Sequence, residues 1–231
     1  MAQGRGLEGA VLKLMGGKDF TLTVTAKEQV SEGYLRLRLT DGGLLAANPV
    51  HPTMWVRLWF RNAGRPHQRA YTLVDPDPGS GTFALEFALH EGAASDWARG
   101  AKAGDTIEAT VQGTGFESPV PVPTHILAIG DPASLPAINS LLDAHSSLPA
   151  TVWFEGGDEE LPFRHGVRRV RRGELVDRVK AELPEVLAST PSPYVWIACD
   201  TRTTRTLSSY VRKDLGVARE RMHALGYWRA S

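Results

Sequence analysis

The sequence contains little that would support a disulfide framework, a metal centre or a surface for polyanions. Its single cysteine, Cys199, cannot form a disulfide within the chain, which favours a reducing compartment. The seven histidines include no pair spaced three or four residues apart, so we expect no protein-bound metal. Lys plus Arg and Asp plus Glu number 26 each, and without a net charge we expect no nucleic-acid partner.

Long hydrophobic runs are absent as well. No stretch approaches the roughly 18 consecutive apolar residues of a transmembrane helix, so we expect no membrane partner. The first 20 residues are rich in glycine and carry Lys or Arg where a secretory signal needs an uncharged apolar core. We therefore predict a cytoplasmic protein; a monomer is compatible with the sequence, which does not fix the oligomeric state.

Apolar and polar residues alternate from residue 20 to about residue 112, which is typical of antiparallel strands. The alternating runs are 20–24, 35–39, 54–60, 69–75, 83–89 and 107–111. A short stretch near 94–100 does not alternate and predicts a helix. We expect a six-stranded antiparallel β-barrel within residues 1–120.

The pattern changes after the proline-rich segment 119–124. Residues 125–129 form a continuous apolar run, as in a strand buried on both faces, and a helical stripe follows them. Similar strand runs at 151–155, 167–170, 194–198 and 227–228 alternate with helical patterns near 175–183 and 207–215. Residues 121–231 are therefore expected to form a mostly parallel, Rossmann-like α/β domain.

Ligands of parallel sheets bind beyond the carboxyl ends of the strands, which places a candidate site in the loops after residues 129, 155 and 199. The first loop, residues 130–134, opens a helix whose backbone amides would suit an anion, although a plain turn explains it equally well. Five arginines at 164, 168, 169, 171 and 172 form a basic cluster. They either protect an exposed strand edge or hold an anionic ligand.

Arg69, Tyr71 and Thr72 lie within one predicted strand, and about twenty residues later Gly92 and Ser95 lie at a predicted helix start. Ser95 is interpreted either as a helix N-cap or as part of a small anion pocket. An Arg-x-Tyr-Thr strand followed by such a helix start, in a barrel that precedes an α/β domain, resembles the flavin site of the ferredoxin reductase group.

The motifs resemble more narrowly the siderophore-interacting FAD-binding proteins, which are NAD(P)H-dependent ferric-siderophore reductases. Their R-x-Y-T matches residues 69–72, and their H-x-x-x-G-P-A-S-x-W-A matches residues 90–98 with a shortened spacer. Their G-D-E-T-A-L-P-A matches residues 130–137, and their closing G-Y-W-R matches residues 226–229. The resemblance covers nearly the whole chain in order.

The resemblance implies that FAD is reduced by NADH or NADPH and then reduces a ferric siderophore. Tyr71 would lie against the flavin ring, Thr72 near its reactive edge, and Arg69 at a phosphate. The other implied cofactor-binding residues are Leu89, His90, Gly92, Ala93, Ala94, Ser95, Trp97, Asp131, Ser134, Asp200 and Trp228. Arg57 and Arg229 are candidates for receiving an anionic siderophore.

This chain departs from the family pattern at Pro132 and Ala133, which replace an acidic and a hydroxyl residue in the nicotinamide-side turn. The electron donor therefore stays open, and the sequence does not decide between NADH and NADPH. Two other interpretations also stay open: a flavin reductase that exchanges electrons with a protein partner, and a protein that binds siderophore or flavin without turnover. The identity of the siderophore cannot be read from the sequence.

Overall fold

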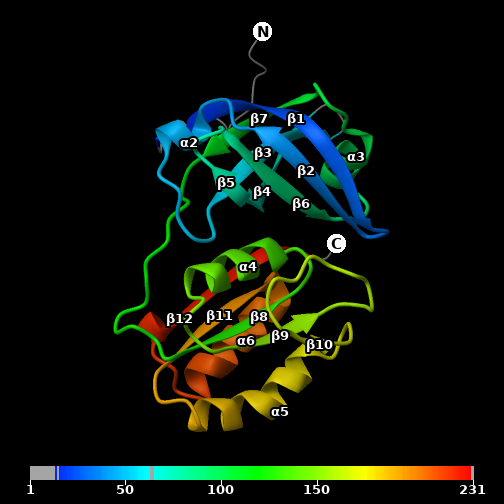
Figure 1. The fold of residues 1–231 in the computed structure, drawn as a ribbon. Helices are drawn as coiled ribbons and strands as arrows, with labels where there is room; N and C mark the ends of the chain where they lie inside the picture. Colours follow the sequence, from blue (N-terminus) through cyan, green and yellow to red (C-terminus); the bar gives the residue numbers. More distant parts are fainter. Residues whose placement is uncertain (1–13, 15, 63–64, 230–231) are drawn as a thin grey trace. The chain divides into compact units, whose positions relative to one another are not determined.

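The computed structural model describes residues 14, 16–62 and 65–229 of the chain. The chain divides into two compact units, Met1–Phe116 and Glu117–Ser231 (Figure 1). Most of the N-terminal stretch judged to be a poor secretory signal lies outside the described residues. No helix in the described ranges is both long enough and apolar enough to span a bilayer.

The first unit contains a seven-stranded antiparallel sheet in the order β4-β3-β7-β1-β2-β6-β5. Its elements are β1 (Lys18–Ser31), β2 (Tyr34–Thr40), α2 (Leu44–Ala47), β3 (Trp55–Asn62), β4 (Arg65–Thr72), β5 (Val74–Asp77), β6 (Thr82–Ala88), α3 (Ala93–Gly100) and β7 (Thr106–Val111). The predicted antiparallel sheet is confirmed. It curls into a half-barrel with seven strands rather than six.

The additional strand comes from a break at Leu73. β4 pairs with β3 at one edge of the sheet, while β5 pairs with β6 at the opposite edge. The Leu73 amide donates to the Met54 carbonyl at 2.8 Å, and the Leu73 side chain is buried. The expectation of one continuous strand at 69–75 is therefore wrong: the chain crosses here from one edge of the sheet to the other.

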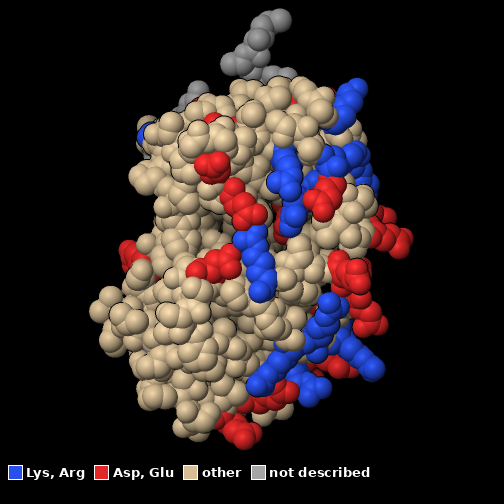
Figure 2. Space-filling model, viewed as in Figure 1, with Lys and Arg blue, Asp and Glu red and all other residues tan. Residues whose placement is uncertain are grey.

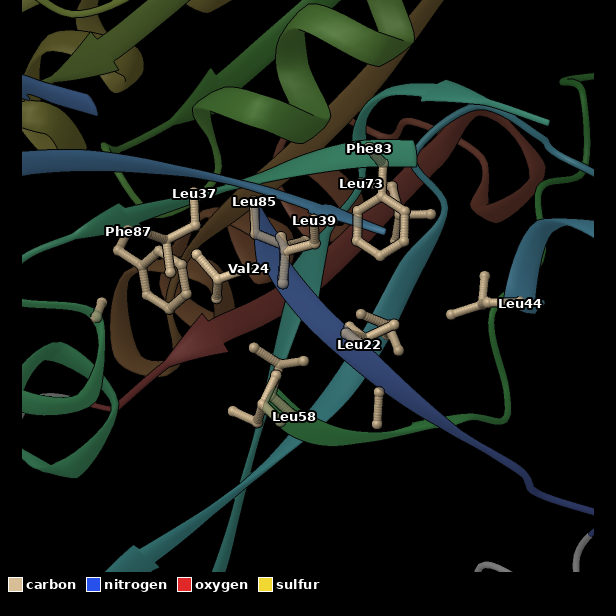
Figure 3. Packing of buried hydrophobic residues seen from close by; sticks show 14 of the residues in the cluster. Leu22, Val24, Leu37, Leu39, Leu44, Leu58, Leu73, Phe83, Leu85 and Phe87 are labelled. Atoms are coloured by element: carbon tan, nitrogen blue, oxygen red, sulfur yellow. The ribbon is translucent and has the colours of Figure 1, made fainter. Parts of the chain in front are cut away.

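The alternating apolar residues fill the concave side of this sheet, as the period of two predicts. Figure 3 shows Leu22 and Val24 of β1 in the same layer as Leu37, Leu85 and Phe87 of the neighbouring strands. These side chains are almost completely buried. Removing each from water contributes about 1.5–3 kcal/mol, which makes this layer the main source of stability of the unit.

The second unit is a five-stranded parallel sheet in the order β10-β9-β8-β11-β12. Its elements are β8 (His125–Gly130), α4 (Leu135–Ala144), β9 (Ala150–Glu155), β10 (Arg168–Val170), α5 (Leu175–Ala188), β11 (Pro193–Asp200), α6 (Thr201–Lys213), the 3-10 turn η1 (Arg219–Arg221) and β12 (Met222–Trp228). Helix α4 covers one face, while α5 and α6 cover the other (Figure 1).

This strand order confirms the predicted Rossmann-like topology. The first strand of the unit, β8, lies between β9 and β11, so the direction of winding reverses between β8 and β11. In open parallel sheets such a switch point is where ligands bind, beyond the carboxyl ends of the strands. The turns after β8 and β11 therefore face the expected binding edge of the unit.

Candidate functional site

Two predicted flavin contacts from distant parts of the sequence meet in an aromatic cluster at the rim of the half-barrel core. The ring centroid of Tyr71 lies 4.4 Å from that of Phe87 and 6.3 Å from that of Phe60. Trp97, on α3, lies 5.8 Å from Phe60 and 6.2 Å from Phe87. Tyr71 and Trp97 thus share the same two phenylalanines, and both keep part of their surface exposed.

The strand register explains the position of Tyr71. Tyr71 pairs with Val56, and Arg69 with Leu58, and both partners are core residues. Directly paired residues point to the same face of a sheet, so Arg69 and Tyr71 project to the concave side along the edge strand. Burial raises the pKa of the Tyr71 hydroxyl, against the effect of the Arg69 guanidinium, so this hydroxyl stays protonated.

The start of α3 provides backbone donors beside this rim. Gly92 is the N-cap with φ of 134°, a conformation that favours glycine, and no side chain caps the helix. Ser95 is therefore not the N-cap. Its buried hydroxyl accepts the His90 amide at 3.1 Å, which closes the loop between β6 and α3. Ala93 packs against the core through a small side chain. The first amides of a helix have no partner within the helix and can bind an anion.

The remaining candidates of the first unit lie around this rim. Leu89 packs against the core, Ala94 is buried, and the His90 ring bonds the Glu91 carbonyl at 2.6 Å. Arg69 is exposed and donates to the Gln68 carbonyl at 2.9 Å, with no acidic partner among the described residues.

Thr72 and Arg57 project to the convex face of the sheet. Thr72 is buried opposite Trp55, and the Arg57 guanidinium lies 4.7 Å above the Trp55 ring. The structure therefore separates them from Tyr71 and Arg69, which point to the concave face.

In the second unit, the turn after β8 is held by its own polar groups. The Asp131 amide donates to the Ser134 hydroxyl, which in turn donates to the Asp131 carbonyl, both at 3.0 Å. The amides of Ala133 and Ser134 donate to the Asp131 carboxylate and carbonyl at 3.0 Å. Pro132 has no amide hydrogen. The free amides expected in this turn are thus engaged internally, and Ser134 is fully buried.

Three strand ends converge on the same edge. The Trp228 indole donates to the Asp131 carboxylate at 2.7 Å, and the Trp228 carbonyl accepts from the Thr201 hydroxyl at 2.9 Å. Asp200 caps α6 by accepting the amides of Arg202 and Thr203. The structure thus brings together Asp131, Ser134, Asp200 and Trp228, whereas Arg229 follows β12 as an exposed residue.

Cys199 lies buried under this edge. Burial raises the pKa of its thiol, and the carboxylates of Asp131, Glu155 and Asp200 raise it further. The thiolate, which is the nucleophilic form, is therefore disfavoured. Cys199 acts as a small core residue. Within the described ranges, no group of three or more His, Cys, Asp or Glu side chains could hold a metal ion.

The basic cluster is mostly engaged with its own unit. Arg164 pairs with Asp143 at 2.8 Å, Arg168 pairs with Glu182 at 3.0 Å, and Arg169 donates to two backbone carbonyls. Figure 2 shows basic and acidic side chains next to one another over β10 and α5. Arg171 and Arg172, in the turn after β10, are exposed and remain available to an anion.

The aromatic cluster contains two residues that sequence reasoning did not assign to the site. Phe60 and Phe87 belong to the alternating runs 54–60 and 83–89, a pattern that predicts strands and does not indicate a ligand. Their position under Tyr71 and Trp97 depends on the curvature of the sheet, which strand periodicity does not encode. Thr201 was also missed, since a threonine at a helix start usually signals nothing beyond local structure.

Comparison with known proteins decides the family. Residues 21–112 match the siderophore-interacting FAD-binding domain, and residues 123–231 match the siderophore-interacting protein family. The chain belongs to the siderophore-interacting protein family. Its two-domain fold is that of the ferredoxin reductases: a ferredoxin NADP+ reductase from Neisseria gonorrhoeae, solved with bound FAD and NADP, superposes with a TM-score of 0.73 at 15% identity and covers 91% of this chain and 99% of that chain.

Several known proteins are similar over most of this chain. The siderophore interacting protein of Acinetobacter baumannii has a TM-score of 0.78 at 19% identity, covering 93% of this chain and 92% of that chain. The ferric acinetobactin reductase of Acinetobacter baumannii is 21% identical over 79% of this chain and 70% of its own length. The mycobactin import ATP-binding/permease protein IrtA of Mycolicibacterium smegmatis is 32% identical over 97% of this chain. The chain spans 27% of that protein's length.

Proposed function

We propose that this protein is an FAD-dependent ferric-siderophore reductase that takes electrons from NADH or NADPH. One observation carries the proposal: Tyr71 and Trp97 meet on the shared Phe60–Phe87 base beside the uncapped start of α3. Partly exposed aromatic surface next to backbone amides suits a cofactor that combines a flat ring with a pyrophosphate. The family membership supports FAD as that cofactor.

The residues present in the first unit fit FAD. Gly92, with φ of 134°, begins α3 without a side-chain cap, and the next residue, Ala93, carries only a methyl group. Arg69 has a guanidinium fork free of acidic partners among the described residues, which suits bidentate binding of a phosphate. Tyr71 and Trp97 would contact the ring system. We assign the FAD domain to residues 1–120 and the NAD(P)H domain to residues 121–231.

In the second unit, the nicotinamide cofactor would bind beyond the carboxyl edge at the β8–β11 switch point. The turn after β8 does not supply phosphate-binding amides, because its own groups engage them. The exposed Arg171 and Arg172 would instead bind the phosphates of the nicotinamide cofactor. Asp200 and Ser134 would shape the edge by fixing α6 and the β8 turn, and the exposed ring of Trp228 would contact the cofactor.

When bound, FAD supplies the chemistry, because it accepts a hydride and releases electrons one at a time. The chain's own task is to bind, orient and shield. Thr72 points to the convex face, away from Tyr71, so its hydroxyl is not assigned to the reactive edge of the ring. Arg57 on that same face and the exposed Arg229 would attract an anionic ferric siderophore. Hard oxygen ligands hold ferrous iron less tightly than ferric iron, so reduction promotes release of the metal. No general acid or base is required for this electron transfer.

The β8 turn also supports a second candidate, a protein that binds flavin and siderophore without turnover. Pro132 and the internally engaged amides weaken the case for a nicotinamide donor at this turn. A reductase that receives electrons from a protein partner would use the same first unit.

Similarity to a mycobactin import protein suggests mycobactin-type siderophores as substrates to test.

The purified protein, loaded with FAD, is mixed anaerobically with NADH or NADPH, and a ferric siderophore is then added. The reductase proposal expects flavin absorbance to bleach with at least one donor and to return on addition of the ferric siderophore. If neither NADH nor NADPH bleaches the flavin but a chemical reductant does, two outcomes separate the alternatives. Bleaching by reduced ferredoxin would favour a protein electron donor. A chemically reduced protein that leaves ferric iron unchanged would favour the non-catalytic binder.

A further inference from the structure

Both oxygens of the Asp131 carboxylate form hydrogen bonds within the protein. One oxygen accepts the Ala133 amide at 3.0 Å, and the other accepts the Trp228 indole N–H at 2.7 Å. Asp131 is only 4% exposed, so a ligand at the edge of the sheet has little access to it. If Asp131 contributes to cofactor binding, it must therefore act through another residue.

Trp228 is the residue through which it can act. Its side chain is 41% exposed although its indole nitrogen is hydrogen-bonded. Its carbonyl accepts the Thr201 hydroxyl at 2.9 Å, so backbone and ring are both fixed. A register shift between β11 and β12 precedes it, between the pairs Cys199–Gly226 and Asp200–Trp228. This shift turns the side chain towards the β8 turn.

The close packing of β12 on α6 reinforces this position. A Cβ atom added at Gly226 would lie 2.9 Å from the Thr201 hydroxyl and 3.1 Å from its Cα. Only glycine permits this approach without displacing the start of α6. Trp228 is consequently held between the start of α6 and the turn after β8, at the switch point between β8 and β11.

We propose that Asp131 is a positioning residue, which holds the Trp228 indole so that its exposed face stacks on a heteroaromatic ring of the nicotinamide cofactor. This rests on the proposed function, since it assigns the donor to the second unit. A charge-assisted hydrogen bond fixes ring orientation better than packing alone. An exposed aromatic face stacked on a flat ligand is a recognised source of affinity.

The hold on Trp228 should depend on pH. Burial raises the pKa of Asp131 to about 6, against the hydrogen bonds from Trp228 and Ala133, and the Glu155 carboxylate on β9 adds a smaller upward shift. Cys199 on β11 stays neutral, because burial and the carboxylates of Asp131, Glu155 and Asp200 raise the pKa of its thiol. Above pH 6 the ionised carboxylate holds the indole; below it the bond loses its charge assistance.

Tryptophan fluorescence of the full chain tests the hold without any cofactor. Subtracting the Trp228→Phe signal from that of the native protein isolates Trp228 from the other five tryptophans. We expect this difference to titrate with a midpoint near pH 6 and the titration to vanish in Asp131→Asn. Asp158→Asn, an exposed acid in the loop after β9, is the matched control and should leave the midpoint unchanged. A titration that survives in Asp131→Asn would overturn the proposal.

Calorimetric binding of NAD+ and NADP+ tests the consequence. Asp131→Asn and Trp228→Phe should each weaken the better ligand about tenfold, and the double variant should lose no more than either single variant, because both remove one interaction. Independent, multiplicative losses would contradict the proposal. If Asp131→Asn does not fold, Trp228→Phe alone decides: native affinity should fall below pH 6, and that of the variant should not.

Absence of nucleotide binding by the native protein would refute the proposed function and the stacking role together. The fluorescence titration would then still show whether Asp131 holds Trp228. The two failures are therefore distinguishable.

Discussion

Replacing Gly130 with alanine tests how tightly the turn after β8 is built. A Cβ atom at this position would lie 2.4 Å from the Ser134 hydroxyl oxygen and 2.5 Å from the Ile138 Cδ1 atom. Neither neighbour can retreat easily, because Ser134 and Ile138 are almost completely buried. The methyl group must therefore displace the turn or the first residues of α4.

The cost follows from these two contacts. Overpacking a buried site costs about 1–3 kcal/mol. Moving Ser134 also strains its two hydrogen bonds to the Asp131 backbone, each worth about 0.5–1.5 kcal/mol. We expect a loss of about 2–5 kcal/mol in the second unit, which for a unit of this size lowers its Tm by roughly 10 °C or more.

Differential scanning calorimetry of the full chain measures this loss. Gly157→Ala is the matched control: a Cβ there meets nothing within 4 Å, so its Tm should stay close to that of the native protein. FAD affinity should be unchanged in both variants, because Gly130 lies outside the first unit. A Gly130→Ala protein as stable as Gly157→Ala would refute the description of this turn.

Three further variants test other parts of the account. Arg69→Ala should weaken FAD binding about 10–100-fold, because it removes charge-assisted hydrogen bonds to a phosphate. Arg65→Ala, exposed on the same strand, should not weaken it. Equal flavin-to-protein ratios in the two purified variants would argue against Arg69 as a phosphate-binding residue. Gly92→Ala should also lower flavin content, because φ of 134° strains an alanine, while Gly100→Ala, which meets no atom within 4 Å, should retain it; circular dichroism checks that both fold. Asp131 should make the free energy of unfolding depend on pH, because its pKa rises from 3.8 in the unfolded chain to about 6 in the folded protein. Its stabilising contribution is therefore complete below about pH 4 and is lost as the pH rises through about 6. We expect a loss of about 3 kcal/mol in urea unfolding, which Asp131→Asn should not show.

Much of the fold could be predicted because strand and helix periodicities are local properties of the sequence. The alternation through Leu35, Leu37 and Leu39 places one face of β2 in the core, and the structure confirms it. The break at Leu73 could not be predicted in this way. It depends on the Met54 carbonyl and on two strand edges that are brought together only in the folded unit.

The candidate site was predictable in its residue types but not in its hydrogen bonds. The motifs led to Tyr71, Trp97 and Asp131 through resemblance to a family. They did not show that the Asp131 carboxylate accepts a hydrogen bond from the Trp228 indole, because the two residues are 97 positions apart and meet only across parallel strands. Ser95 was placed at a helix start, but its hydroxyl instead closes the preceding loop, a choice set by the conformation of Gly92.

The central claim is that this chain passes electrons from a nicotinamide cofactor through FAD to a ferric siderophore. Anaerobic stopped-flow spectroscopy of the FAD-loaded protein tests it most directly, with NADH or NADPH in one syringe and a ferric siderophore added in a second mixing step. The account predicts bleaching of the flavin bands, followed by their recovery together with formation of ferrous iron, faster than with free reduced FAD. Flavin that bleaches with neither donor, or ferric iron reduced no faster than by free reduced FAD, would contradict it.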